Sequence, residues 1–554
     1  MNKQWVLLCL SVLEVFAKDE RESRMTTIRQ GQVKGYKDPE GNFFAYYGIP
    51  YATAPTGFGR FQAPLPGPVW LRPLEAVDKG IVCPQAHIDL PQMKNKVMQD
   101  DCLIANVYVP NTDETNIPVV VIVHGGAFQV GYSDLISPKP FVQDKNVIAV
   151  TFNYRLGING FLCLGTEGAP GNAGLKDQVA LLRWVKENIA KFGGNPNDVT
   201  IAGCSAGSVS VDLLMLSRST RGLFTKVIPE SGSNVGVITM QMNPLENAKK
   251  YALSLNFTDV NDVYALELFY KTAPIEQLTR DAFFNNKDSN FGFTPCIERK
   301  GKESFIDDLP MNIIKSKNYA KLPMLYGFDN MEGWLRLNFF QLWKSQMNED
   351  FSDFLPADLD FESDDQKKQV AKIVKQFYFG DSSIENNNIL EYIDYFTDVL
   401  FAYSTLKAIK LHVEAGHDQI YLYEYSFADK NSPAVPFVDV RGAPHCAQST
   451  ITFEGKTIFS LESNPTDEAI NMVKNMREMW YNFIKMGQPV PENSTLPSWP
   501  PAKVDCSPHM SLGNTIELKG KLLEERTLFW DDIYRKHYRP PVPPPTPPAK
   551  HTEL

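Results

Sequence analysis

The sequence lacks a long apolar run beyond its first residues: no later segment offers the roughly eighteen unbroken apolar residues that a membrane-spanning helix needs. Basic runs, and basic patches interleaved with aromatic residues, are also missing, and the net charge of the 554 residues is -10. We therefore expect no nucleic-acid partner, no binding to acidic membranes and no transmembrane anchor in the mature chain. Internal repeats are absent as well.

Cysteine is scarce, with eight residues, and their spacing matches no metal-ligand pattern. Because Cys9 lies in a predicted signal sequence, seven cysteines remain, and at least one thiol has no partner within the chain. Cys83 and Cys102 enclose a short segment with proline and glutamine, and we expect a disulfide between them. The pairing of the others is left open; they are Cys163, Cys204, Cys296, Cys446 and Cys506.

Both ends of the chain resemble processing signals. Residues 1–17 combine Lys3, an apolar run at 5–10 and small residues before a charged stretch, as in a cleaved secretory signal peptide. The main domain is then expected over residues 18–538. Residues 539–554 form a proline-rich tail, predicted to be an extended spacer. Its end, His551–Leu554, is similar to ER-retention signals, which bind a receptor.

Two glycosylation sequons agree with a luminal route. Asn256 and Asn493 each precede a threonine by two residues and are candidate glycosylation sites. We therefore expect the protein in the secretory pathway, in the ER lumen if the tail is functional and secreted otherwise.

Continuous apolar runs alternate with helical patterns, which indicates an α/β domain with a large sheet buried on both faces. Segments of helical pattern at about 244–318 and 341–388 are expected to cap this sheet. The predicted strands are 118–123, 147–152, 199–202, 226–229, 322–327 and 420–425, and the predicted helices are 174–192, 208–216 and 466–485.

The most informative motif is Gly-Cys-Ser-Ala-Gly at residues 203–207, between the apolar run 199–202 and the helical run 208–216. A serine on a sharp turn between strand and helix is typical of a nucleophile elbow. The flanking glycines matter because side chains there would collide with the neighbouring strand and helix. Ser205 is therefore the candidate nucleophile.

A serine hydroxyl needs a base, and the base needs an orienting group. Of the eight histidines, His445 is the one in a Gly/Pro loop that follows a late predicted strand, from where it can reach back to Ser205. For the acid, Asp329 and Glu332 both follow the strand that ends near residue 327, and spacing alone leaves either of them possible.

The oxyanion of an acyl-transfer reaction needs hydrogen-bond donors. His-Gly-Gly at residues 124–126 directly follows a predicted strand, so the N–H groups of Gly125 and Gly126 are candidates, together with that of Ala206 after the nucleophile. No metal and no cofactor are needed for such a reaction.

These motifs resemble the type-B carboxylesterase and cholinesterase family of α/β-hydrolases, from about residue 48 to 534. The stretches that carry the resemblance are GIPYA (48–52), DCL with NVY (101–108), HGG (124–126), NYRLG with GFL (153–162), GNAGL with DQ (171–178), FGGNP (192–196) and GCSAG (203–207). The resemblance implies an α/β-hydrolase fold: a large mixed, mostly parallel central sheet flanked by helices, with helical cap insertions.

The resemblance also implies roles for single residues. The family's Ser, Glu and His triad corresponds to Ser205, Glu332 and His445, its first disulfide to Cys83 and Cys102, and a second serine near the acid and base to Ser231. Cys204 stands where the family has Glu or Gln, Ala127 where it often has Gly, and Cys446 begins a segment that is often acidic. These departures bear on substrate preference and remove no reacting group.

Subfamily features narrow the expected substrate. Residues 84–101 contain no tryptophan for a choline cation, and Cys204 instead of Gln weakens the likeness to juvenile hormone esterases. The chain resembles lepidopteran-like insect carboxylesterases, which implies hydrolysis of uncharged carboxylic esters through an acyl-enzyme on Ser205. Two alternatives remain: a non-catalytic binding protein of the same fold, or a low-turnover protein that sequesters esters and organophosphates.

Overall fold

The computed structural model describes residues 21–87, 91–280, 285–454 and 465–549. The predicted signal peptide and the tetrapeptide His551–Leu554 lie outside the described residues. Within them, the central sheet has 13 strands. These strands are β1 (Ser23–Ile28), β2 (Gly31–Lys37), β3 (Phe43–Pro50), β6 (Leu74–Glu75), β9 (Ile104–Pro110), β10 (Ile117–Val123), β11 (Ile148–Phe152), β12 (Gly194–Cys204), β13 (Lys226–Glu230), β14 (Met324–Asp329), β15 (Ile420–Tyr425), β16 (His509–Leu512) and β17 (Ile516–Lys519).

The strand order is β1-β2-β3-β9-β11-β10-β12-β13-β14-β15-β16-β17, with β6 beside β2. The seven strands from β11 to β16 in this order pair in parallel, whereas the pairs from β1 to β11 and the β16–β17 pair are antiparallel. The expected large, mixed and mostly parallel sheet is confirmed. The six strands predicted from apolar runs all belong to it. Five of them begin within two residues of the expected start, and β12 begins five residues earlier than expected, at Gly194.

The sheet is buried on both faces because its central strands are apolar throughout. In β10, Val119 and Val121 pack into one core cluster, and Val120 and Ile122 pack into another on the opposite face. Successive side chains of a strand point to opposite faces, so a continuous valine-rich run fills both cores.

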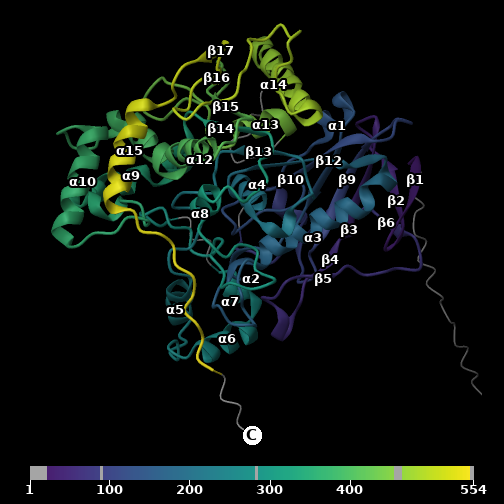
Figure 1. The fold of residues 1–554 in the computed structure, drawn as a ribbon, viewed down its shortest axis with the longest axis horizontal. Coiled ribbons are helices and arrows are strands. Elements are labelled where there is room, and N and C mark those ends of the chain that lie inside the picture. Colours follow the sequence, from purple (N-terminus) through teal and green to yellow (C-terminus); the bar gives the residue numbers. More distant parts are fainter. Residues whose placement is uncertain (1–20, 88–90, 281–284, 455–464, 550–554) are drawn as a thin grey trace, which may run out of the picture.

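Helices cover the two faces and form insertions between the strands (Figure 1). They are α1 (Lys139–Lys145), α2 (Gly157–Phe161), α3 (Ala173–Asn188), α4 (Ala206–Leu216), α5 (Pro244–Ser254), α6 (Val263–Thr272), α7 (Ile275–Leu278), α8 (Pro310–Lys315), α9 (Phe340–Glu349), α10 (Asp364–Phe379), α11 (Ile389–Thr397), α12 (Tyr403–Glu414), α13 (Ala447–Phe453), α14 (Asp467–Met486) and α15 (Glu524–His537). The predicted helical insertions correspond to α5–α8, between β13 and β14, and to α9 and α10, between β14 and β15.

The described part of the proline-rich tail packs against the body of the protein. It runs in extended form from α15 past α5 towards α6 (Figure 1). The N–H of Val542 donates to the C=O of Met242 at 3.1 Å, and the hydroxyl of Tyr264 donates to the C=O of Pro548 at 2.8 Å. The prediction of a spacer is therefore corrected for these residues: without N–H groups, prolines cannot pair in a sheet, but their carbonyls still accept hydrogen bonds from the surface.

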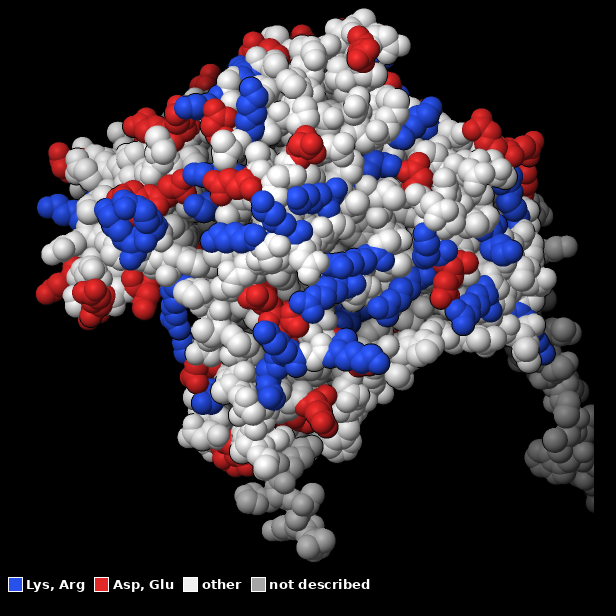
Figure 2. Space-filling model, viewed as in Figure 1, with Lys and Arg blue, Asp and Glu red and all other residues white. Residues whose placement is uncertain are grey.

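The surface carries charges of both signs. Figure 2 shows Lys and Arg side chains gathered across the middle of one face, over α3 and α8, with acidic groups between and beside them. Elsewhere, Asp531 accepts hydrogen bonds from both Lys407 (2.8 Å) and Lys410 (3.2 Å). A search of the described residues finds no helix with the length and apolar character needed to cross a bilayer.

Candidate active site

Ser205 occupies a strained turn between β12 and α4. Its backbone angles are φ 61° and ψ -126°, a combination that side-chain-bearing residues rarely adopt and that often marks functional sites. The turn is held by hydrogen bonds at both ends: the N–H of Ser205 donates to the C=O of Glu230 at 2.9 Å, and its C=O accepts from Val209 at 3.0 Å.

The glycines on either side of Ser205 allow the strand and the helix to approach closely. A Cβ on Gly203 would lie 2.5 Å from the carbonyl carbon of Gly207, and a Cβ on Gly207 would lie 2.2 Å from the carbonyl oxygen of Val123. No side chain fits at these distances. The sequence motif therefore has the strand, turn and helix geometry expected of a nucleophile elbow.

His445 and Glu332 are brought together although they are 113 residues apart. The Nδ1 of His445 is hydrogen-bonded to Oε2 of Glu332. The other carboxylate oxygen of Glu332 accepts from the N–H of Asp329 at 2.9 Å. Glu332 is completely buried, whereas His445 remains 8% exposed. The carboxylate thus fixes one ring nitrogen and leaves Nε2 to accept a proton.

The contact to His445 distinguishes the two carboxyl groups at the end of β14: Asp329 is the last residue of the strand, and Glu332 lies three residues further along the chain. Asp329 instead accepts from the N–H of Ala447 (3.2 Å) and from the hydroxyl of Ser231 (3.4 Å). Burial and the neighbouring charge of Glu332 raise the pKa of the Asp329 carboxyl well above 3.8. Asp329 therefore holds the segment that follows His445, and Glu332 contacts the imidazole itself.

The oxyanion loop follows β10 and touches the nucleophile. A Cβ on Gly125 would lie 2.7 Å from the carbonyl oxygen of Cys204 and 3.1 Å from the Cβ of Ser205. Gly126 has φ 111°, and Ala127 also has a positive φ of 54°. Ala206 is the first residue of α4, where a helix has no internal acceptor for the N–H. Gly125 and the start of α4 at Ala206 therefore both lie next to Ser205.

Other histidines are held in buried structural positions. His124 stacks on Tyr154 with ring centroids 4.3 Å apart, and burial lowers the pKa of its imidazole to about 4. His412 is fully buried in α12, and its Nδ1 lies 2.8 Å from the hydroxyl of Tyr319.

A third buried carboxyl group, that of Glu230, lies at the end of β13. It accepts from the hydroxyl of Ser449 (2.6 Å) and from the indole N–H of Trp480 (3.0 Å), yet burial raises the pKa of its carboxyl to about 7. Next to it in the chain, Ser231 accepts from Nε2 of Gln448 at 2.8 Å. These contacts anchor the start of α13, which directly follows the His445 loop. Sequence reasoning assigned no role to Glu230, Gln448 or Ser449, because their contacts join segments that are far apart in the sequence.

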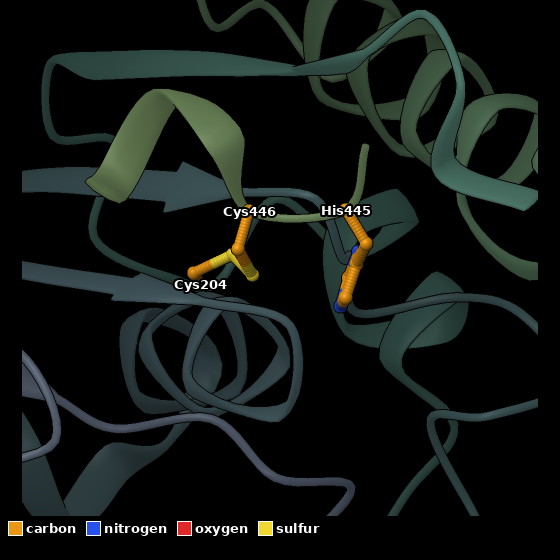
Figure 3. A group of neighbouring side chains, drawn as sticks. All are labelled: Cys204, His445 and Cys446. Atoms are coloured by element: carbon orange, nitrogen blue, oxygen red, sulfur yellow. A yellow bond between two sulfur atoms is a disulfide. The ribbon is translucent and has the colours of Figure 1, made fainter. Parts of the chain in front are cut away.

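Among the cysteines that the structure describes there are three disulfides, Cys83–Cys102, Cys163–Cys296 and Cys204–Cys446, and Cys506 is a buried free thiol. Figure 3 shows the third disulfide beside the imidazole of His445. Metal-ligand atoms of Cys204, His445 and Cys446 lie within 4.8 Å of one another, but the two sulfurs are bonded to each other and offer no thiolate. The Cys204–Cys446 bond joins two of the positions at which the sequence departs from the family pattern, and the sequence did not predict it. Asn256 and Asn493 are both exposed.

Known proteins with this sequence pattern are esterases. Residues 22–530 match the model of the carboxylesterase family. A protein of Bombus ignitus named carboxylic ester hydrolase is 35% identical over 440 residues, which are 77% of this chain and 78% of that protein. Juvenile hormone esterase of Heliothis virescens is 32% identical over 483 residues, 83% and 84% of the two chains. The crystal structure of juvenile hormone esterase from Manduca sexta, with OTFP covalently attached, has a TM-score of 0.81 at 28% identity, covering 93% of this chain and 100% of that chain.

Proposed function

The chain belongs to the carboxylesterase family and is a carboxylic ester hydrolase, and we propose that Ser205, His445 and Glu332 catalyse its reaction through an acyl-enzyme. The observation that carries this proposal is the hydrogen bond between Nδ1 of His445 and Oε2 of Glu332, in a protein whose Ser205 sits on a strained elbow. Together they supply a nucleophile, a base with one nitrogen left for the proton, and a carboxylate that orients the base.

The proposed chemistry proceeds in two steps. The hydroxyl oxygen of Ser205 attacks the ester carbonyl carbon while Nε2 of His445 takes its proton, and the carboxylate of Glu332 stabilises the resulting imidazolium. The alcohol leaves with the proton from Nε2. Water, deprotonated by the same nitrogen, then attacks the acyl group and releases the acid together with free Ser205. Neither step uses a metal or a cofactor.

A negative charge develops on the carbonyl oxygen during the reaction. We assign its stabilisation to the N–H groups of Gly125, Gly126 and Ala206. Their support is the close approach of Gly125 to the side chain of Ser205 and the position of Ala206 at the start of α4. Backbone donors that are fixed before the reaction lower the barrier because they need not reorganise.

We further propose uncharged esters as the substrate class, of the xenobiotic, dietary, odorant or pheromone type. Phe128 and Phe401 are buried apolar side chains beside the oxyanion loop and the base. The segment between Cys83 and Cys102 has no tryptophan that could bind a quaternary ammonium group. The likeness to juvenile hormone esterases adds esters of that hormone type to the compounds to be assayed.

The proposed route of the protein is the secretory pathway, with retention in the ER if His551–Leu554 is recognised. Three disulfides and two exposed sequons support an oxidising compartment. Peptide mapping of the protein from its natural source for glycans on Asn256 and Asn493 would test this route.

Initial hydrolysis rates on p-nitrophenyl esters of increasing acyl length, measured on wild type and on Ser205→Ala, test the proposed function. We expect turnover by the wild type and its loss in the variant, with the chain-length series ranking acyl size. If the wild type binds esters and organophosphates but shows no turnover at any length, the sequestering function replaces the proposal. Retained turnover in Ser205→Ala would reject Ser205 as nucleophile.

A further inference from the structure

The Cys204–Cys446 disulfide joins the two halves of the proposed catalytic machinery. Cys204 directly precedes Ser205, and Cys446 directly follows His445. The two cysteines are 242 residues apart in the sequence, and their Cα atoms are 6.1 Å apart. Ser205 and His445 are each one peptide unit, about 3.8 Å between Cα atoms, from a bridged cysteine. Figure 3 shows the imidazole beside this bond.

Hydrogen bonds hold the residues before His445 to the segment of the acid. The N–H of Met331 donates to the C=O of Ala443 at 3.0 Å, and the N–H of Ala443 donates to Oδ1 of Asn330 at 2.9 Å. The imidazole adds its hydrogen bond to Glu332. These contacts fix the base relative to its acid, since Asn330, Met331 and Glu332 all follow β14.

The residues after His445 are likewise held to the ends of β13 and β14. Ala447 donates to Asp329, Gln448 to Ser231 and Ser449 to Glu230. The disulfide instead connects the His445 loop to a different strand, β12. It does so at Cys204, the residue directly before Ser205. Within the described residues it is the one covalent cross-link between β12 and the His445 loop.

We propose that the Cys204–Cys446 disulfide is a positioning device that sets the His445 loop at the distance from Ser205 that proton transfer requires. Cys204 and Cys446 are positioning residues, because they act on the reaction through the base and touch no reacting atom. Proton transfer between heavy atoms needs a separation near 3 Å, and a misplacement of about 1 Å can cost roughly 100-fold in rate.

The sequence supports a paired function for these cysteines. They stand at two of the positions where the chain departs from the pattern of the family that it resembles, and the departures flank the nucleophile and the base. The bond explains both at once, because one cysteine without the other could not form it. A polar residue before the nucleophile is thus replaced by a covalent link to the base loop.

The proposal rests on the proposed function, and the test is built to separate the two. Cys204→Ala/Cys446→Ala removes the bond, and Cys163→Ala/Cys296→Ala removes a disulfide that does not involve the residues proposed to react. Each protein is titrated with an organophosphate to count competent serines, and kcat and KM are then measured per titrated site on p-nitrophenyl esters. Counting sites in this way excludes any unfolded fraction from the rate.

We expect kcat per site to fall about 10- to 100-fold in Cys204→Ala/Cys446→Ala with KM within about twofold, because the loss lies in proton transfer and not in ester binding. Each single variant should lose as much as the double, since either one removes the whole bond. The control Cys163→Ala/Cys296→Ala should keep kcat per site within about twofold, whatever its loss of thermal stability.

Unchanged kcat per site in the double variant, or an equal fall in the control, would overturn the proposal. Peptide mapping that finds Cys204 and Cys446 as free thiols in active wild type would also overturn it. If Ser205→Ala keeps its activity, the proposed function fails instead.

A reduction experiment covers the case in which the double variant does not accumulate. A dithiol such as dithiothreitol gives two electrons and two protons to the S–S bond, forming two thiols, and itself closes to a cyclic disulfide. We expect kcat per site to fall in proportion to the fraction of the Cys204–Cys446 bond that peptide mapping finds reduced. A rate that does not follow this fraction would contradict the proposal.

Discussion

The phenyl ring of Phe401 stacks on the imidazole of His445, with ring centroids 4.3 Å apart and planes 23° from parallel. Phe401 belongs to a π-helical turn, Asp398–Ala402, between α11 and α12. Such turns are frequent at functional sites, because the extra residue in the turn redirects side chains. The carboxylate of Glu332 fixes the imidazole at one nitrogen, and the stack with Phe401 limits the tilt of its plane.

Phe401→Leu should lower kcat several-fold and leave KM nearly unchanged, because the imidazole loses the flat surface that holds its plane. Phe379→Leu is the matched control. Phe379, the last residue of α10, is also buried and packs against the aromatic ring of Phe351. Steady-state rates per titrated serine measure the effect. Equal changes in kcat for both variants would show that the effect is general destabilisation.

Replacing Glu332 and Asp329 in turn should separate the roles of their two carboxyl groups. Glu332→Gln should lower kcat about 1,000- to 10,000-fold, since the amide cannot stabilise the imidazolium. Asp329→Asn should change kcat far less, because Asp329 acts on the segment after His445 through the N–H of Ala447, and the amide oxygen of the variant can still accept from that N–H. The measurement is kcat of both variants on the same ester. A larger loss of kcat for Asp329→Asn than for Glu332→Gln would make Asp329 the acid of the triad.

The free energy of unfolding should fall as the pH rises, because the Glu230 carboxyl loses its proton. Burial raises the pKa of this carboxyl from its ordinary value of 4.5 to about 7 in the folded state, so between these pH values the folded state binds more protons than the unfolded state. This contribution of Glu230 to the free energy of unfolding is fully present below pH 4.5 and is lost as the pH rises through about 7. The total loss is about 3 kcal/mol.

Denaturant unfolding at pH 5 and pH 8 tests this dependence. Glu230→Gln should flatten the loss of unfolding free energy between the two pH values relative to wild type, since the amide does not titrate. An unchanged difference between pH 5 and pH 8 in the variant would show that Glu230 stays charged in the folded protein.

Local sequence patterns were sufficient where local physics decides the structure. The apolar run at 420–425 predicted the bounds of β15, and the amphipathic pattern at 466–485 predicted α14 to within one residue at each end. Spacing could not choose between Asp329 and Glu332, since one ends β14 and the other lies three residues later, and only the path of the chain decides which reaches His445. The resemblance to the family supplied that choice.

Contacts between segments that are far apart in the chain could not be predicted from the sequence. Phe401 reaches His445 through a π-helical turn that has no sequence signature. The partner of Cys204 could not be found because seven cysteines allow many pairings and the two bonded residues are 242 positions apart. The tail was predicted as a spacer because proline-rich composition reports backbone conformation and not the surface on which the chain lies.

Ala127 should act as a limit on substrate size. It adopts φ 54° in the oxyanion loop, a conformation that glycine adopts with less strain. Ala127→Gly should keep the N–H group and the hydrolysis of short acyl esters, and should raise the relative rate on longer or branched ones. Ala127→Val should abolish activity, because a β-branched residue is strongly disfavoured at this φ. A p-nitrophenyl ester series on the two variants measures both effects, and an unchanged chain-length profile in Ala127→Gly would contradict the assignment.

Gly125→Ala should remove most of the activity without unfolding the protein. The added Cβ would lie 2.7 Å from the carbonyl oxygen of Cys204 and 3.1 Å from the Cβ of Ser205, so the loop must move away from the nucleophile. Since N–H donors work only when they are close to the developing charge, we expect kcat to fall about 100- to 1,000-fold. Gly520→Ala is the control, because a Cβ there meets no atom within 4 Å. Activity and melting temperature are measured on both variants. If Gly125→Ala retains wild-type kcat, the N–H groups of this loop do not bind the oxyanion, and the donors must come from elsewhere around Ser205.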